Sequence, residues 1–434
     1  MKKITFIGAG SVQFTTAVVN DLMTYPAFWD AEICLMDIHA GHLAAITACV
    51  ERIKNAWESE IRITSTLSRE AALEGADAVI ITVFNGDVDV WRHEIEIPMT
   101  YGVDINIGDT RSVSGIFRAL RNIPLLLEIC RDVQRLCPKA VVLNYTNPMA
   151  MLCKAMQTHT KVDVTGLCHS VQGTAQMLKE WTGAESVEYT CVGINHMAFF
   201  TQLTSEGRDL YPILREKLQD PAYYNKEKVR NELFSTFGYY VTESSGHNSE
   251  YTAWFRKRPE LVEQFCHGDG ANWNPGEHAY SLKLRRDPQR FEKTVKAWLE
   301  KPVPKTRGKE YAAGILNARI GDGTPFAFNA NLLNHGSVEN LPWDACVEIP
   351  VTATKDGYRR EFQGSLPSCV APLVAYTAGI ENLVVEAWEK RSVQMVCQAV
   401  ALDPLCGAVL TLEQVKQMCR EIFAKNRDYL GDFQ

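Results

Sequence analysis

Cysteine and histidine stand together in two short stretches of the sequence, and these residue types can bind a metal ion. Cys168 and His169 follow an apolar run, 162–167, and precede a helix-like segment, 171–181. This arrangement is typical of a loop at the carboxyl end of a strand, where α/β proteins place their chemistry. His196 ends the sequence Gly-Ile-Asn-His further along. A thiolate and an imidazole that the fold brought together would bind a borderline-soft divalent metal.

The elements that must position such a site begin with a glycine turn. Residues 3–7 read as a strand, and Gly8, Gly10 and Ser11 form the turn before a helix expected over 15–23. The tight turn needs the first glycine, and the second lets backbone N–H groups approach a pyrophosphate at the helix N-terminus. The third glycine of the G-x-G-x-x-G pattern is replaced by glutamine, so this dinucleotide fingerprint is incomplete.

A second strand, 32–36, ends on Asp37. An acid at this position hydrogen-bonds the ribose diol of NAD and repels the 2′-phosphate of NADP. The alternative is that Asp37 only caps the helix that follows.

Further strands and helices alternate up to about residue 195, which predicts a doubly wound parallel sheet of Rossmann type. The strands are expected over 61–64, 78–84 and 140–143, and the helices over 92–101 and 116–137.

Asparagines follow the tips of two of these strands. Asn85 follows one, and Asn144 and Asn147 follow the next. Strand tips are where a nicotinamide ring and its substrate meet in such folds. The alternative is that Asn147 merely opens a turn with Pro148 before the next helix.

Residues 187–194 look like the last strand of this N-terminal unit, and the pattern changes after them. A polar cluster over 242–251 is expected to be a loop, and 263–307 is charged and helix-prone. Strands of a smaller sheet are expected over 327–338 and 346–353. We therefore predict two domains, a dinucleotide-binding domain over 1–195 and an α+β domain for substrate, metal and oligomerisation over 196–434, fused over a large shared interface.

Composition excludes some classes of protein. The chain has 434 residues, of which 46% are hydrophobic, and a net charge of −7. It has no long basic run, so nucleic acid and anionic membranes are not expected partners. The 13 cysteines are odd in number and scattered. Such cysteines are typical of buried thiols in a reducing compartment, which predicts a cytoplasmic protein.

The sequence resembles family 4 of the glycoside hydrolases from end to end, and its α-galactosidase members most closely. The residues that carry this resemblance are Gly8-Ala9-Gly10-Ser11, Met36-Asp37-Ile38, Gly108-Asp109-Thr110, Asn144-Tyr145-Thr146-Asn147-Pro148-Met149, Cys168-His169-Ser170-Val171, Gly193-Ile194-Asn195-His196, Glu243-Ser244-Ser245, Glu250-Tyr251, Asn340-Leu341-Pro342 and Ser365-Leu366-Pro367.

The resemblance implies a fold related to lactate and malate dehydrogenases and a need for NAD⁺ and a divalent metal, usually Mn²⁺. It also implies an oxidative mechanism, an exception to the two-carboxylate scheme of most glycosidases. Hydride leaves C3 of the sugar, a base removes the C2 proton, the C1–O bond breaks, water adds at C1, and the hydride returns.

The resemblance also implies residue roles. Cys168 and His196 would ligate the metal, and Tyr251 aligns with the base. His169 would assist the leaving group or orient the sugar, and Asn147 would bind sugar hydroxyls. Second choices are Asp109, Glu243 and His247.

Two departures from the family pattern bear on the substrate. Arg111 stands where many relatives carry a glycine-rich run, and it would pair with a uronate beside the sugar, or else point to solvent or to a neighbouring subunit. Within 246–249 an expected aromatic residue is missing. We therefore keep α-hexuronidase and α-glucosidase as alternatives to α-galactosidase.

A 2-hydroxy-acid dehydrogenase and a non-catalytic NAD-binding sensor stay open because fold alone does not determine function. The expected partner is a small α-glycoside, and the family resemblance implies a homodimer or homotetramer.

Overall fold

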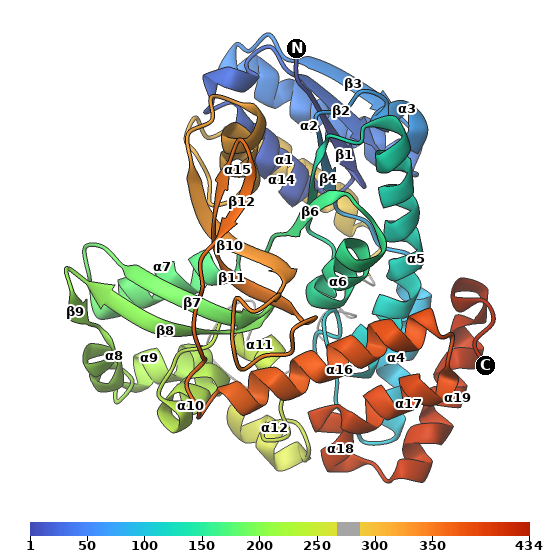
Figure 1. Ribbon diagram of the computed structural model, residues 1–434, viewed down its shortest axis with the longest axis vertical. Coiled ribbons are helices and arrows are strands. Elements are labelled where there is room, and N and C mark those ends of the chain that lie inside the picture. The colour runs from blue at the N-terminus through green and yellow to red at the C-terminus, as the bar shows by residue number, and fades with distance from the viewer. Residues whose placement is uncertain (267–286) are drawn as a thin grey trace.

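The computed structural model describes residues 1–266 and 287–434, which form a mixed α/β structure built on one large sheet (Figure 1). Within these residues the sheet has 12 strands, in the order β3-β2-β1-β4-β5-β6-β10-β11-β7-β8-β9, with β12 beside β11. The strands are β1 Lys3–Ile7, β2 Glu32–Met36, β3 Arg62–Thr66, β4 Ala78–Ile81, β5 Val141–Asn144, β6 Asp163–Gly166, β7 Glu188–Ile194, β8 Met197–Ser205, β9 Arg208–Asp209, β10 Phe326–Leu333, β11 Cys346–Thr354 and β12 Gly357–Arg360.

The first six strands are parallel, as predicted for a doubly wound sheet. Successive side chains of β1 and β4 alternate between two buried clusters: Ile4 and Ile80 pack on one face, and Ile7 and Val79 on the other. Strands buried on both faces read as almost continuous apolar runs, which explains why the sequence revealed them. The helices connecting these strands are α1 Val12–Leu22, α2 Ala40–Trp57, α3 Arg69–Leu73, α4 Val88–Thr100, α5 Ser112–Leu136 and α6 Met149–His159, with a 3₁₀ turn at Pro26–Phe28.

Two predictions about the second half of the chain are wrong. Strand β7 does not close the parallel sheet, because it pairs antiparallel with β8 and β11. Strands β10 and β11 do not form a separate smaller sheet, because β10 pairs with β6 and continues the large one. An apolar run predicts a strand but says nothing about the direction of its partner. The division into domains at residues 195 and 196 stays a prediction.

Of the remaining helices, α7–α12 lie on the side of the antiparallel strands β7–β9, and α16–α19 pack beside α4 and α5 (Figure 1). Helix α14 packs against α2, and α15 packs against α1 and β11. Of the charged stretch 263–307, α12 and α14 are helical as expected, and 267–286 lie outside the described residues. No helix in the described part of the chain is long and apolar enough to cross a membrane. These helices are α7 Ser170–Thr182, α8 Tyr211–Lys217, α9 Pro221–Tyr224, α10 Lys228–Phe237, α11 Ser245–Asn248, α12 Pro259–Phe265, α14 Arg290–Glu300, α15 Ala312–Ile320, α16 Ala371–Glu389, α17 Val393–Leu402, α18 Pro404–Val409 and α19 Leu412–Leu430, with a 3₁₀ turn at Asn225–Glu227.

A row of four paired residues crosses the sheet where its two parts meet. Gly166 of β6 pairs with Asn331 of β10, which pairs with Glu348 of β11, which pairs with Gly193 of β7. A side chain at Gly166 would collide with the sulfur atoms of α6 behind the sheet, so this strand comes close to the helix. The row joins the strand that precedes Cys168 to the strand that precedes His196.

Candidate metal and active site

The structure brings Cys168 and His196 together in a buried cluster and adds Glu243 to them. Cys168 Sγ lies 3.3 Å from His196 Nε2, and Glu243 Oε2 lies 3.5 Å from the same nitrogen. The three ligand atoms lie within 4.8 Å of one another. A thiolate, an imidazole and a carboxylate at this spacing fit one divalent cation. Burial and the nearby carboxylate of Glu243 raise the pKa of the Cys168 thiol, so a cation would be needed to form the thiolate.

Two of these residues have an unusual backbone. His196 and Glu243 have φ angles of 61° and 68°, in the left-handed region that residues other than glycine seldom occupy. His196 lies in the tight turn between β7 and β8, and Glu243 precedes α11. Such strained positions persist only where the surrounding structure enforces them, and they gather at functional sites.

The ring proton of His196 can be assigned from its neighbours. Thr110 donates its hydroxyl proton to Asp109 at 2.7 Å, so the Thr110 oxygen accepts from His196 Nδ1 at 3.2 Å. The Tyr251 hydroxyl lies 3.3 Å from the same nitrogen. The proton therefore lies on Nδ1, and Nε2 presents its lone pair to Cys168 and Glu243. Burial lowers the pKa of His196 to about 4, which keeps the ring neutral.

Tyr251 is buried between charged groups. Burial raises the pKa of its hydroxyl well above the usual value, and the carboxylate of Asp109 raises it further. The Arg111 guanidinium, 4.6 Å from the centre of the Tyr251 ring, opposes both effects. Loss of the Tyr251 proton therefore depends on the positive charges and donors around it.

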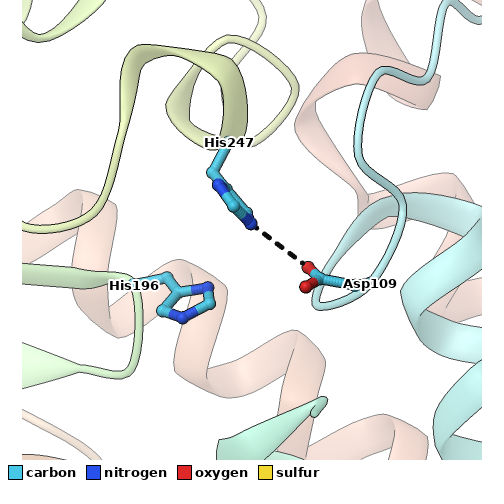
Figure 2. Close-up of side chains that lie close together, drawn as sticks. All are labelled: Asp109, His196 and His247. Atoms are coloured by element: carbon cyan, nitrogen blue, oxygen red, sulfur yellow. Dashed lines mark ion pairs between the residues drawn. The ribbon is translucent and has the colours of Figure 1, made fainter. Parts of the chain in front are cut away.

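His247 lies between the carboxylates of Asp109 and Glu243, and Figure 2 shows its ion pair with the first of them. Its Nε2 is 3.4 Å from Asp109 Oδ1, and its Nδ1 is 3.1 Å from Glu243 Oε1. Burial alone would lower the pKa of His247, but Glu243 and Asp109 raise it to about 9. Asp109, His196 and His247 also form a group within 4.8 Å. A protonated imidazole has no lone pair for a metal, so we favour the group with Cys168 as the metal site.

The predicted polar loop 242–251 is buried, contrary to expectation, because its polar atoms bind one another and the loop before Asp109. The Glu250 carboxylate accepts from the backbone N–H groups of Asn106, Ile107 and Gly108 at 2.7, 2.9 and 2.9 Å. Glu250 thus fastens the loop that carries Asp109 to the segment that carries Tyr251. Its role as an anchor was not predicted from the sequence.

Glu250→Gln is expected to lower the free energy of unfolding by about 2–4 kcal/mol, because the amide has one acceptor oxygen for three buried donors. The midpoint of urea unfolding measures this effect. Glu292→Gln, the same change at an exposed position on α14, should stay within about 0.5 kcal/mol of the wild-type protein. Equal losses in the two variants would contradict the anchoring role.

Arg111 is neither in solvent nor at a subunit boundary. Its side chain is 5% exposed, and Nη2 lies 3.1 Å from Glu381 of α16 and donates to the Asn195 carbonyl. The alternatives that place Arg111 in solvent or at a neighbouring subunit are therefore wrong. Glu381 compensates the charge of Arg111, but the Nε and Nη1 atoms of Arg111 are buried without a hydrogen-bond partner. Pairing with a uronate therefore stays a prediction.

Glu348 lies behind the metal cluster and was missed by sequence reasoning. Its Oε1 lies 3.4 Å from the Asn331 amide, and burial raises the pKa of its carboxyl to about 8. An acid inside the apolar strand β11 is a signal that the sequence does contain. With this raised pKa, the Glu348 carboxyl group is neutral at pH 7.

Glu348 should make stability depend on pH. The folded protein keeps the Glu348 proton up to about pH 8, whereas an ordinary glutamate loses it near 4.5. Stability should therefore fall as pH rises between these two values. Glu348→Gln keeps a neutral side chain, so its melting temperature should rise relative to the wild type by at least about 2 °C between pH 5 and pH 8. If the melting temperatures of the wild type and Glu348→Gln changed equally between pH 5 and pH 8, the raised pKa of Glu348 would be contradicted.

The glycine turn is built as predicted. Gly8 has a φ of 84°, and a side chain there would collide with the Thr82 carbonyl.

Asp37 does not cap α2, so that alternative is wrong. Its Oδ1 accepts a hydrogen bond from the His39 amide at 2.9 Å, and its Oδ2 accepts one from the Gly10 amide at 2.8 Å. Ser11 precedes α1 without capping it by its side chain. The turn and the acid lie at the carboxyl ends of adjacent strands, which fits a dinucleotide.

The asparagines divide into two groups. Asn85 and Asn144 use their side chains within the fold: Asn85 donates to the Arg121 carbonyl at 2.7 Å, and Asn144 donates to the Thr146 carbonyl at 3.0 Å. Asn147 Oδ1 is buried without a hydrogen-bond partner. An unpaired buried carbonyl suits a ligand hydroxyl, so Asn147 fits its predicted place better than the other two.

His169 stands apart from the buried cluster. Its side chain is 54% exposed, and Nδ1 lies 3.9 Å from Glu310 Oε1, next to the start of α7. The structure thus places His169 beside the metal cluster but toward solvent.

The chain belongs to family 4 of the glycosyl hydrolases. The family model matches residues 3–184, and the model of the family's C-terminal domain matches 191–406. An α-galactosidase of Bacillus subtilis is 35% identical, with both chains covered completely. An α-galacturonidase of Thermoanaerobacter italicus is 28% identical, covering 99% of this chain and 97% of the relative. The fold matches a 6-phospho-α-glucosidase from gut microorganisms, solved in complex with NAD and Mn²⁺, with a TM-score of 0.81, 17% identity and complete coverage of both chains.

Proposed function

We propose that this protein is an α-galactosidase that works with NAD⁺ and a divalent metal such as Mn²⁺. The observation that carries the proposal is that Cys168, His196 and Tyr251 lie together in one buried group, in a chain whose first strand is followed by a glycine turn that suits a dinucleotide. An ordinary glycosidase has no use for a dinucleotide, and an ordinary dehydrogenase has no use for a thiolate metal site. Identity of 35% with an α-galactosidase over the whole chain supports the choice of sugar.

A bound NAD⁺ would supply a reversible acceptor for the C3 hydride, which it would return after elimination and water addition, and a bound metal would supply the positive charge that makes the C2 proton acidic. Cys168 and His196 would hold the metal, and Asp37 and the turn of Gly8, Gly10 and Ser11 would hold the dinucleotide. Asn85 and Asn144 keep the adjoining strand ends in place for the same cofactor.

Tyr251 takes the C2 proton. Its hydroxyl lies within hydrogen-bonding reach of His196 Nδ1, which carries a proton and can donate it to a phenolate. The Arg111 guanidinium over the ring also stabilises negative charge there. These two contacts oppose the burial that holds the pKa of Tyr251 well above its usual value, and the positive charge of a bound metal would lower that pKa further.

Asn147 and His169 act on the sugar. The unpaired Oδ1 of Asn147 accepts a hydrogen bond from a sugar hydroxyl. His169, whose side chain is more exposed than the cluster, would orient the sugar or assist the departing group. We expect the enzyme to work in the cytoplasm as a homodimer or homotetramer.

Hydrolysis of p-nitrophenyl α-galactoside, α-glucoside and α-galacturonide tests the proposal, each with NAD⁺, Mn²⁺ and a thiol reductant and then with each omitted in turn. Cleavage of the galactoside that disappears without NAD⁺ or Mn²⁺ is expected. Cleavage of the galacturonide alone would support the mechanism but show that the substrate is a galacturonide and not a galactoside. Net NADH formation from a 2-hydroxy acid, without cleavage of any glycoside, would favour the dehydrogenase.

A further inference from the structure

We propose that Glu243 is a third protein ligand of the metal and that His247 and Asp109 hold it in place. This inference rests on the proposed function, which needs a divalent metal at Cys168 and His196. It goes further in naming a carboxylate donor and in predicting which metal the site prefers.

The two oxygens of Glu243 have different neighbours. Oε1 faces His247 Nδ1 at 3.1 Å, and Oε2 faces His196 Nε2 at 3.5 Å. Cys168 Sγ approaches that same nitrogen at 3.3 Å. Oε1 therefore forms an ion pair with His247, whose Nδ1 also contacts Ser244 Oγ at 2.8 Å. Oε2 points into the space between the thiol and the imidazole.

Lone pairs converge on this space. The proton of the His196 ring lies on Nδ1, on the side of Thr110 and Tyr251, so Nε2 presents a lone pair. Once Cys168 has lost its proton, the sulfur, the nitrogen and the Glu243 oxygen all face one point with no proton between them. A cation at that point would relieve their mutual repulsion, and ligand atoms within 4.8 Å of one another can all reach it.

A carboxylate changes which metal suits the site. Thiolate and imidazole ligands alone favour zinc and other softer ions, whereas carboxylate oxygens suit Mn²⁺. Three protein donors also leave positions for two oxygens of a sugar. Glu243 is therefore the ligand that should make this site accept a hard divalent ion.

His247 and Asp109 act as positioning residues for this ligand. His247 bridges Glu243 and Asp109, and Glu250 fastens the loop that carries Asp109. Partners that orient a ligand usually change metal affinity when they are removed, by about 10- to 100-fold in other proteins. His247→Asn should therefore weaken Mn²⁺ binding without removing any ligand atom.

Metal binding by the full-length protein tests the proposal. Four chelator-treated proteins would be compared: the wild type, Glu243→Gln, Cys168→Ser and Glu348→Gln. Each would be titrated with Mn²⁺, with the free ion measured by electron paramagnetic resonance, and in a parallel experiment with Zn²⁺. Glu243→Gln should weaken Mn²⁺ binding at least about tenfold and Zn²⁺ binding less than about threefold. Glu348→Gln, a buried glutamate outside the ligand group, should stay within about twofold of the wild type.

The outcomes separate this inference from the proposed function. Mn²⁺ binding that is lost in Cys168→Ser but unchanged in Glu243→Gln would overturn the role of Glu243 and leave the metal site standing. Unchanged binding in Cys168→Ser would overturn the metal site itself. Equal weakening of Mn²⁺ and Zn²⁺ in Glu243→Gln would also overturn the ligand role. If Glu243→Gln loses its cooperative melting transition, Glu243→Asp, which keeps the carboxylate, should retain the preference for Mn²⁺, and a loss of that preference would count against the proposal.

Discussion

Tyr251→Phe is expected to reduce turnover of an α-galactoside by about a thousandfold, within the range that general base catalysis contributes. Phenylalanine keeps the ring that lies under Arg111 but removes the oxygen that faces His196 Nδ1. Binding of NAD⁺ and of Mn²⁺ should therefore stay close to that of the wild type, and the loss should appear in kcat.

Tyr240→Phe is the matched control, because Tyr240 is also fully buried and its hydroxyl donates to Asn231 at 2.9 Å, away from the metal cluster. This variant should keep most of its turnover. Steady-state kinetics with p-nitrophenyl α-galactoside would compare the two. If Tyr251→Phe kept more than about a tenth of the wild-type turnover, Tyr251 would not be the base.

Arg111→Met should lower the free energy of unfolding by about 3–5 kcal/mol, because it leaves the Glu381 carboxyl buried without its partner. The two side chains are 5% and 7% exposed and lie 3.1 Å apart. Arg111→Lys keeps the positive charge but loses the planar contact with the Tyr251 ring and part of the guanidinium's hydrogen-bond donors. Its loss of unfolding free energy should therefore lie between those of the wild type and Arg111→Met.

A double-mutant cycle with Glu381→Gln separates the ion pair from other effects of Arg111. The double variant should be more stable than the sum of the two single losses predicts. Urea unfolding of the four proteins gives the coupling free energy. Strictly additive losses, or a gain of galacturonide cleavage in Arg111→Met, would contradict a mainly structural ion pair.

Residues that act through local chain geometry could be predicted from the sequence. Gly8 follows a strand and precedes a helix, so its left-handed turn follows from its neighbours in the chain. Cys168 and His196 each follow a strand, so the sequence alone predicts that both lie at strand ends. The parallel strands β1, β2, β4 and β5 were recognised for a similar reason, since each is largely an apolar run.

Contacts between distant segments could not be predicted. Glu381 reaches Arg111 from a helix near the end of the chain, and Glu348 of β11 contacts Asn331 of β10. The segment 242–251 looks like a surface loop because it is polar, yet it is buried since Glu250 and His247 satisfy groups on a loop far away in the sequence. Such pairings depend on the assembled fold, which no local pattern encodes.

Hydrolysis of an α-galactoside in D₂O, followed by NMR of the released galactose, tests the oxidative mechanism most directly. If Tyr251 removes the C2 proton and exchanges it with solvent, the product should carry deuterium at C2. A glycosidase that acts through two carboxylates leaves the C2 proton in place. Release of galactose with its C2 proton fully retained would contradict the proposed mechanism.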